Sequence, residues 1–151
     1  MCILLPVMKM KSSKQVLNSL LKTTQMGQYG IQSVLKEPIR PALQQALESQ
    51  LNEYDAIERE AHNIASQRGW EVSELNPMVK MMANMGTRMR LSFGDKDSKI
   101  AGMMIQGNTR GMILGLRDTH QLQQKDIPLS NLAQKLLDTE HANIRQMQGF
   151  L

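Results

Sequence analysis

A chain of 151 residues is long enough for one domain with a sizeable hydrophobic core and too short for us to expect two. The surplus of 18 basic over 14 acidic residues is small, and only 3% of the residues are aromatic, too few to provide stacking platforms among the basic ones, so the charge does not favour a nucleic-acid-binding surface. The single cysteine, Cys2, excludes an intramolecular disulfide framework and a cysteine-based zinc site, and no stretch is long and apolar enough for a membrane helix.

Residues 1–10 open with a short apolar run that precedes the first lysines. A signal peptide has the reverse order and a longer apolar core, so we do not interpret this run as one. The segment is a disordered extension, a packed arm, or sequence upstream of a true start at Met8 or Met10. We expect one domain over residues 11–151, and a cytoplasmic location fits the cysteine content best.

The rest of the chain favours helices throughout. Leu, Met, Gln, Ala and Lys are frequent, and no run of β-branched and aromatic residues alternates with the period of a strand. A first helix is predicted from an N-cap at Ser12 or Ser13 to Glu37. Pro38 and Pro41 then bracket a tight turn, because the residue before a proline avoids the helical region. The inward positions of this helix are Val16, Leu17, Leu20, Leu21, Thr24, Ile31, Val34 and Leu35.

A second helix is predicted over residues 41–68, with proline in its first turn and Gly69 as its left-handed C-terminal cap. Glu58 falls on its apolar stripe, between Tyr54 and Ala61. The following segment breaks the pattern, and a shorter helix is predicted from about Asn76 to about Gly94.

A third helix is predicted over about residues 97–123, and its apolar residues lie nearly all the way round. We therefore expect it to be covered on several sides, either as the central helix or by a subunit contact. A fourth helix follows over residues 128–148. Four long helices with two tight turns and one long crossover are typical of a ferritin-like four-helix bundle, here with a short extra helix in the crossover. In that topology the second and third helices can run parallel.

Acids and histidines on the second and fourth helices raise the question of a di-iron centre. Such a centre needs about four carboxylates and two Glu-x-x-His pairs at one level of the bundle. His62 follows Glu58 by four residues, whereas the Glu-x-x-His pair needs three. This difference of one residue turns the His62 side chain by about 100° around the helix. On the fourth helix Asp138 and His141 have the spacing, and Glu140 falls near the inward seam.

The count of inward acids does not favour two metal ions. The first helix contains no acidic residue between Ser12 and Lys36, and the third offers Asp118 alone near the seam. We expect no cofactor and no intact metal centre. The acidic residues of the second, third and fourth helices then lie on solvated edges of the bundle, or one of them is buried with a partner such as Arg110, Arg117 or Tyr54.

Two further patterns are candidates for an interface. Methionines recur with helical spacing on the short crossover helix, where they favour an adaptable packing face or a partner groove over a copper site. These are Met78, Met82, Met85 and Met89. Gly107, Gly111 and Gly115 line one side of the third helix and indicate close helix approach. That approach is either a homodimer seam or packing against the first helix, at Gly27 and Gly30.

Three stretches together resemble a known group of proteins: YDAIEREAHNIASQRGWE (residues 54–71), IAGMMIQGNTRGMILGLRD (residues 100–118) and LLDTEHANIRQMQGFL from residue 136. The group consists of small uncharacterised bacterial ferritin-like bundle proteins that are distantly similar to spore-coat components. The resemblance implies a ferritin-like four-helix fold and a non-catalytic role in the cytoplasm or in a spore or cell-surface layer. It supplies no site residues.

No nucleophile with a nearby base, and no phosphate-binding glycine loop, is present in the sequence. We therefore expect a non-enzymatic bundle that acts by self-association, most simply as a dimer, or by binding a protein partner. The alternative is a degenerate ferritin-like metal-binding or di-iron protein that uses Glu58, His62, Asp138, Glu140 and His141.

Overall fold

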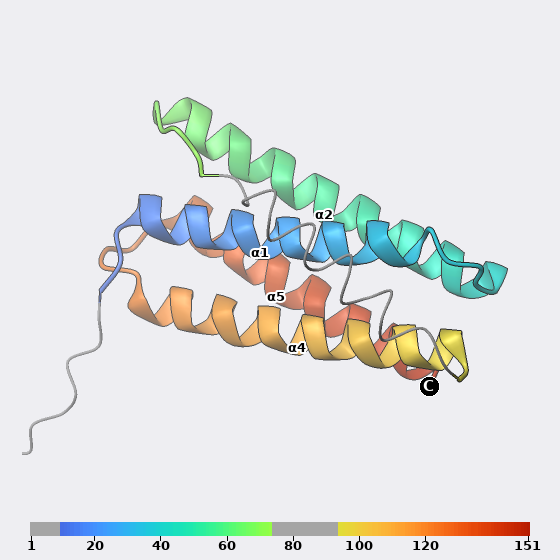
Figure 1. Ribbon diagram of the computed structural model, residues 1–151. Helices are drawn as coiled ribbons and strands as arrows, with labels where there is room; N and C mark the ends of the chain where they lie inside the picture. Colours follow the sequence, from blue (N-terminus) through green and yellow to red (C-terminus); the bar gives the residue numbers. More distant parts are fainter. Residues whose placement is uncertain (1–9, 74–93) are drawn as a thin grey trace, which may run out of the picture.

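The structure is a computed structural model and describes residues 10–73 and 94–151. These residues form α1 (Ser13–Val34), α2 (Pro41–Gln67), α4 (Lys96–Gln121) and α5 (Ile127–Gln148), and they contain no strand (Figure 1). The predicted all-α fold with four long helices is therefore confirmed. The short crossover helix predicted up to about Gly94 lies outside the described residues. None of the described helices is both long and apolar enough to cross a membrane.

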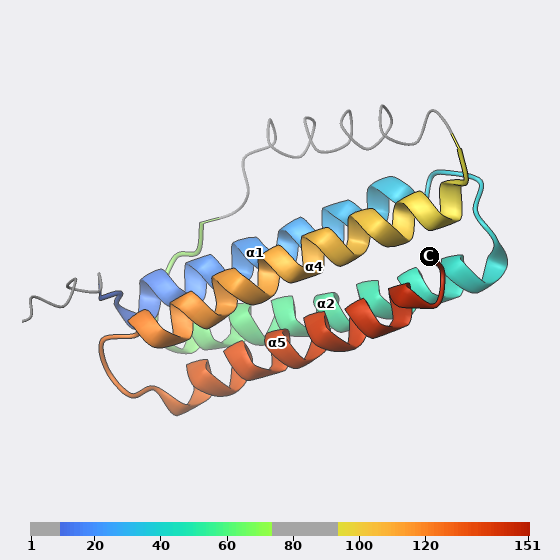
Figure 2. The ribbon, with the colours of Figure 1, turned by 90° about the horizontal axis from the view of Figure 1, so that it is seen from below.

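The helices pack in two layers. Figure 2 shows α1 beside α4 in one layer and α2 beside α5 in the other, and the helix contacts agree with this view. The turns after α1 and α4 are short, so each of these helices is antiparallel to the next. Helices α2 and α4 run in the same direction, so the connection between them leaves one end of the bundle and arrives at the other (Figure 1).

Local sequence signals explain where the helices begin and end. Ser12 caps α1 in a capping box with Gln15, in which each side chain binds the backbone N–H of the other. Asp95 and Asp126 cap α4 and α5 by accepting hydrogen bonds from the first-turn N–H groups. Gly69 follows α2 with a φ of 66°, the left-handed conformation that glycine adopts at low cost.

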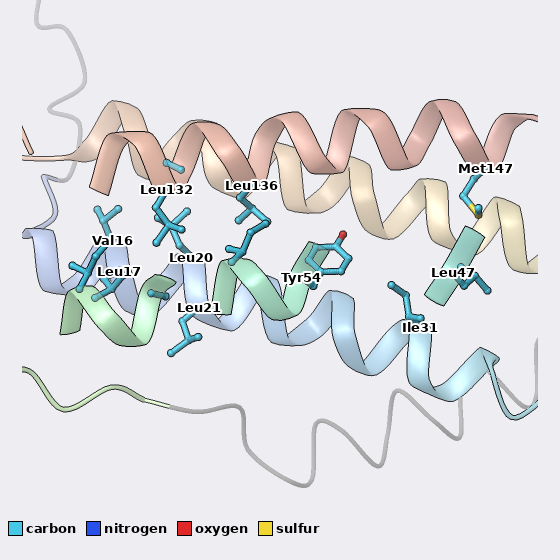
Figure 3. Packing of buried hydrophobic residues seen from close by; sticks show 14 of the residues in the cluster. Val16, Leu17, Leu20, Leu21, Ile31, Leu47, Tyr54, Leu132, Leu136 and Met147 are labelled. Carbon is cyan, nitrogen blue, oxygen red and sulfur yellow. The ribbon is translucent and has the colours of Figure 1, made fainter. Parts of the chain in front are cut away.

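One hydrophobic cluster unites the helices. Leu17 and Leu20 of α1 lie near Leu132 and Leu136 of α5, and further along the bundle Leu47 of α2 lies near Met147 of α5 (Figure 3). α4 contributes less to this cluster, with Ile100 and Ala101 as its fully buried apolar side chains. Ion pairs add contacts at the two ends of the bundle. These pairs are Lys11–Asp118, Arg68–Asp126, Arg40–Asp97 and Lys96–Glu37.

The third long helix is not central, contrary to one of the two expectations from its sequence. Ile113, Leu114 and Leu116 of α4 are each 40% or more exposed. A four-helix bundle buries only one face of each helix, and the neighbours α1 and α5 cover the face that carries Ile100 and Ala101. The other expectation, a subunit contact on α4, stays a prediction.

Candidate functional site

A cluster of polar side chains lies inside the bundle. Tyr54 of α2, Asn108 of α4, and Glu140 and Asn143 of α5 are all buried, with no more than 7% of any of them exposed. Figure 3 shows the Tyr54 ring among the apolar side chains of the core. Buried polar groups are normally hydrogen-bonded, so a cluster of this kind is a place to look for function.

The hydrogen bonds within the protein do not satisfy this cluster. The Tyr54 hydroxyl donates to Asn108 Oδ1 at 3.0 Å. Asn108 Nδ2, Glu140 Oε2 and Asn143 Nδ2 are buried and have no hydrogen-bond partner among residues 10–73 and 94–151. Each unsatisfied buried group costs about 1–3 kcal/mol, so the cluster is stable only if packing elsewhere compensates or if another molecule supplies partners.

Burial controls the ionisation of the cluster. Removal from water raises the pKa of Glu140 from 4.5 to about 8, although the nearby Tyr54 hydroxyl acts in the opposite direction. Burial also raises the pKa of Tyr54 well above its usual 10, and the charge of Glu140 adds to that rise. At neutral pH, Glu140 is therefore mostly a neutral carboxylic acid, which can donate a hydrogen bond as well as accept one.

Two glycines make room for these side chains. A Cβ atom added at Gly111 of α4 would lie 2.7 Å from Glu140 Oε1, and one added at Gly27 of α1 would lie 2.7 Å from the Tyr54 ring. Both distances are shorter than van der Waals contact. Tyr54 and Glu140, which belong to the α2–α5 layer, can therefore reach between α1 and α4 only because these two positions lack a side chain.

The polar cluster lines a groove between α1 and α4. The groove has a volume of about 860 Å³, and Tyr54, Asn108 and Glu140 contribute to its lining. Its apolar lining includes Met26 and Ile31 of α1 together with Met103, Met104 and Leu114 of α4. Lys11 just before α1, Lys22 of α1 and Arg110 of α4 supply positive charge, but Lys11 already pairs with Asp118 at 2.7 Å. The volume lies within the range of small-molecule sites.

The candidate metal ligands do not converge. Glu140 faces the groove, whereas Asp138 and His141 are exposed on other sides of α5. Glu58 and His62 of α2 are half-buried. Among residues 10–73 and 94–151, no group of three or more His, Cys, Asp or Glu residues is placed to hold a metal ion.

The candidate interface residues have different surroundings. Met78, Met82, Met85 and Met89 lie outside the described residues. Gly111 and Gly115 face α5, where Glu140 and Leu137 lie within 3.3 Å of an added Cβ, whereas no described residue lies within 4 Å of a Cβ added at Gly107. Gly111 and Gly115 therefore allow α4 to approach α5. Packing against α5 explains these two glycines, in place of the two expected partners, which were α1 and a second copy of the chain.

The first helix meets its neighbours differently from the sequence expectation. Gly27 accommodates the Tyr54 ring of α2, and only Gly30 approaches α4, with Met104 Cε 3.6 Å from an added Cβ. Helical spacing places the glycines on a common side, but it does not say which neighbouring helix that side meets. The contact partner of a glycine stripe depends on the packing of the whole bundle.

Sequence reasoning found half of the polar cluster. Tyr54 and Glu140 fall on the inward stripes of their helices, where a polar residue is a recognisable signal. Asn143 follows Glu140 by one turn, but an asparagine beside an inward position gives no distinct sequence signal of burial. Asn108 was missed because α4 has no clear apolar face against which a polar residue would stand out.

Comparisons with known proteins support the architecture alone. No family model and no curated protein matches the chain. The solved structure of a "DUF305 fragment from Deinococcus radiodurans" is similar, with a TM-score of 0.71 over 91% of this chain and 93% of that one. Sequence identity is 14%, so the likeness concerns the fold. The described residues thus form an all-helical, four-helix bundle that is similar to this fragment.

Proposed function

We propose that the protein is a non-enzymatic bundle of the ferritin-like type that acts by self-association through the outer side of α4. The parallel course of α2 and α4, joined by a long crossover, supports the ferritin-like assignment. A role in the cytoplasm, or in a coat or surface layer, would suit such a protein.

The exposed apolar residues of α4 carry this proposal. Ile113 and Leu116 are 46% and 44% exposed and point away from the buried side of the helix. The half-buried Ile105 and Met112 follow the same side at helical spacing and extend the apolar surface along α4. An apolar helix face of this kind is normally covered by another protein surface. A second copy offers the same stripe, and a twofold axis would pair the two.

The test is the mass of the protein in solution. We expect light scattering after size exclusion to give the mass of a dimer for the unaltered chain at high micromolar concentration. The double variant Ile113→Glu, Leu116→Glu should elute as a monomer, because burying two carboxylates in the interface is unfavourable. Ile127→Glu is the matched control, since Ile127 is equally apolar and 61% exposed but lies at the start of α5.

Two results would contradict the proposal. The first is a monomer at every concentration for the unaltered chain. The second is a dimer that dissociates equally in the Ile127→Glu control, which would indicate a general effect of charge.

The buried carboxylate of Glu140 is the one observation in favour of a degenerate metal-binding protein. Elemental analysis of protein purified from cells supplied with iron and manganese separates this alternative from the first. Metal near one ion per chain that is lost in Glu140→Ala would replace the proposal of a non-enzymatic bundle. We expect much less than one metal ion per chain, and the same amount in the unaltered chain and in Glu140→Ala.

A further inference from the structure

The groove between α1 and α4 plays no part in the proposed self-association. It is enclosed by two helices, its floor is polar, and its sides are mainly apolar. Gly107 of α4 also lines it, and no atom of the described residues lies within 4 Å of a Cβ added there, so these residues leave the groove open beside this position. The residues that line the groove determine which class of ligand it can bind.

The floor of the groove presents hydrogen-bond donors. Asn108 Nδ2 is buried without a hydrogen-bond partner in the described part of the chain, and the Asn108 amide oxygen already accepts from the Tyr54 hydroxyl. Glu140 Oε2 also has no partner there, and Glu140 is 2% exposed. Because the acid is mostly protonated at neutral pH, it too can donate. The Asn108 amide and the Glu140 carboxyl group both lie near the Tyr54 hydroxyl. A ligand oxygen that accepts hydrogen bonds from both of these donors would suit this place.

The charged residues of the groove favour an anionic ligand. Apart from Glu140, the charged residues among the described lining are Lys11, Lys22 and Arg110. Lys11 is neutralised by Asp118, but no ion pair of Lys22 or Arg110 was found among the described residues. An amine would meet these positive charges, whereas a carboxylate would be attracted by them.

We propose that this groove binds a small monocarboxylate with an apolar body, its carboxylate accepting hydrogen bonds from Glu140 and Asn108. The apolar body would lie against Met26, Met103 and Leu114, whose side chains are flexible enough to fit different chain lengths. Lys22 and Arg110 would contribute long-range attraction.

Binding of octanoate, measured by calorimetry below its micellar concentration, tests the proposal. Octanoate should bind at least tenfold more tightly than octylamine, which has the same chain and the opposite charge. Its affinity should fall about tenfold per pH unit above pH 8, because Glu140 then loses the proton that it donates. Of the other titratable groups of the groove, Tyr54 stays protonated in this range, and Lys22 and Arg110 form no ion pair with another described residue.

Two variants separate binding from folding. Glu140→Gln keeps the shape of the side chain and donates at every pH, so octanoate binding should persist and lose its fall above pH 8. Gly107→Leu places a side chain in the open space and should weaken binding at least tenfold while far-UV circular dichroism is unchanged. Thr109→Leu is the matched control, since Thr109 is exposed on the same helix and does not line the groove.

Several outcomes would overturn the proposal. They are no binding of octanoate at millimolar concentration, tighter binding of octylamine, and unaltered affinity in Gly107→Leu. A fall in affinity above pH 8 that persists in Glu140→Gln would also overturn it, because the titrating group would then be another residue. None of these outcomes bears on the oligomeric state, so the two proposals fail independently.

Discussion

Glu140 illustrates how the surroundings of one residue change its chemistry. On the surface this side chain would be a carboxylate at neutral pH. Inside the bundle, with 2% of it exposed, burial destabilises the ionised form and the pKa rises to about 8. Its neighbour Gly111 is the reason that it fits, since any side chain at that position would meet the carboxyl group.

The raised pKa of Glu140 predicts a specific dependence of stability on pH. The unfolded chain releases the Glu140 proton near pH 4.5, whereas the folded protein holds it until about pH 8. Between these values the folded state binds more protons, so the free energy of unfolding should decrease as pH rises. The decrease is at most about 1.4 kcal/mol per pH unit. Urea unfolding at several pH values from 5 to 9 measures it.

Glu140→Gln is the control for this prediction, because it has nearly the same volume and does not titrate. The variant should lose most of the decrease in stability between pH 5 and 8, and its advantage over the unaltered chain should be largest at pH 9. Parallel pH profiles for the two proteins would contradict the raised pKa. Other titrating groups affect both proteins equally and cancel in the difference.

At the scale of helices, Asp126 joins the end of α2 to the start of α5. Its carboxylate accepts a hydrogen bond from Leu129 N and so caps α5. It also forms a two-bond ion pair with Arg68, at 2.6 and 2.9 Å, in which the guanidinium lies over the Trp70 ring. The hydrogen bond from Arg68 is the main reason that the pKa of Asp126 falls from 3.8 to about 2.

Substitution of Asp126 separates the cap from the ion pair. Asp126→Asn retains a capping oxygen and loses the charge, so we expect it to cost about 1 kcal/mol. Asp126→Ala loses both functions and should cost about 2 kcal/mol. Because the pKa is lowered in the folded state, the ionic part should be present above pH 4 and disappear as pH falls towards 2.

A double-mutant cycle with Arg68→Ala measures the ion pair itself. The coupling energy should be close to the cost of Asp126→Asn at pH 7 and should be much smaller at pH 2. Equal costs for Asp126→Asn and Asp126→Ala would mean that the cap contributes nothing. In that case the hydrogen bond at Leu129 N would not stabilise α5.

At the scale of the whole molecule, a single core predicts cooperative unfolding. The buried cluster contains residues from all four described helices, and Leu132 of α5 lies within it with no exposed surface. Leu132→Ala should reduce the free energy of unfolding by about 2–5 kcal/mol, because it removes a fully buried side chain and leaves a cavity. Chemical denaturation of the variant and the unaltered chain measures this difference.

Two probes test whether the bundle responds as one unit. The fluorescence of Trp70, the only tryptophan, reports on the end of α2, whereas far-UV circular dichroism reports on every helix. Both should give the same midpoint before and after Leu132→Ala, with one transition. Separate midpoints would show that the α1–α2 and α4–α5 pairs unfold independently.

The helices themselves could be predicted from local sequence. The expected helix at residues 41–68 is observed at Pro41–Gln67, and that at 128–148 at Ile127–Gln148. Serine, proline and aspartate at helix starts and glycine at a helix end act within a few residues of themselves, so their effects can be read without knowledge of the fold. The same applies to most buried positions of α1 and α2, whose apolar stripes have the helical period.

What the sequence by itself determined is therefore the set of helices, their inward faces and the scarcity of acids on them. Only the tertiary structure decided that Tyr54 and Glu140 meet Asn108, that Gly111 faces Glu140, and that α4 keeps an apolar side uncovered. The physical reason is that helical periodicity fixes the direction of a side chain relative to its own helix. Its neighbours, and hence its pKa and unsatisfied hydrogen bonds, depend on which helices pack together and in what register.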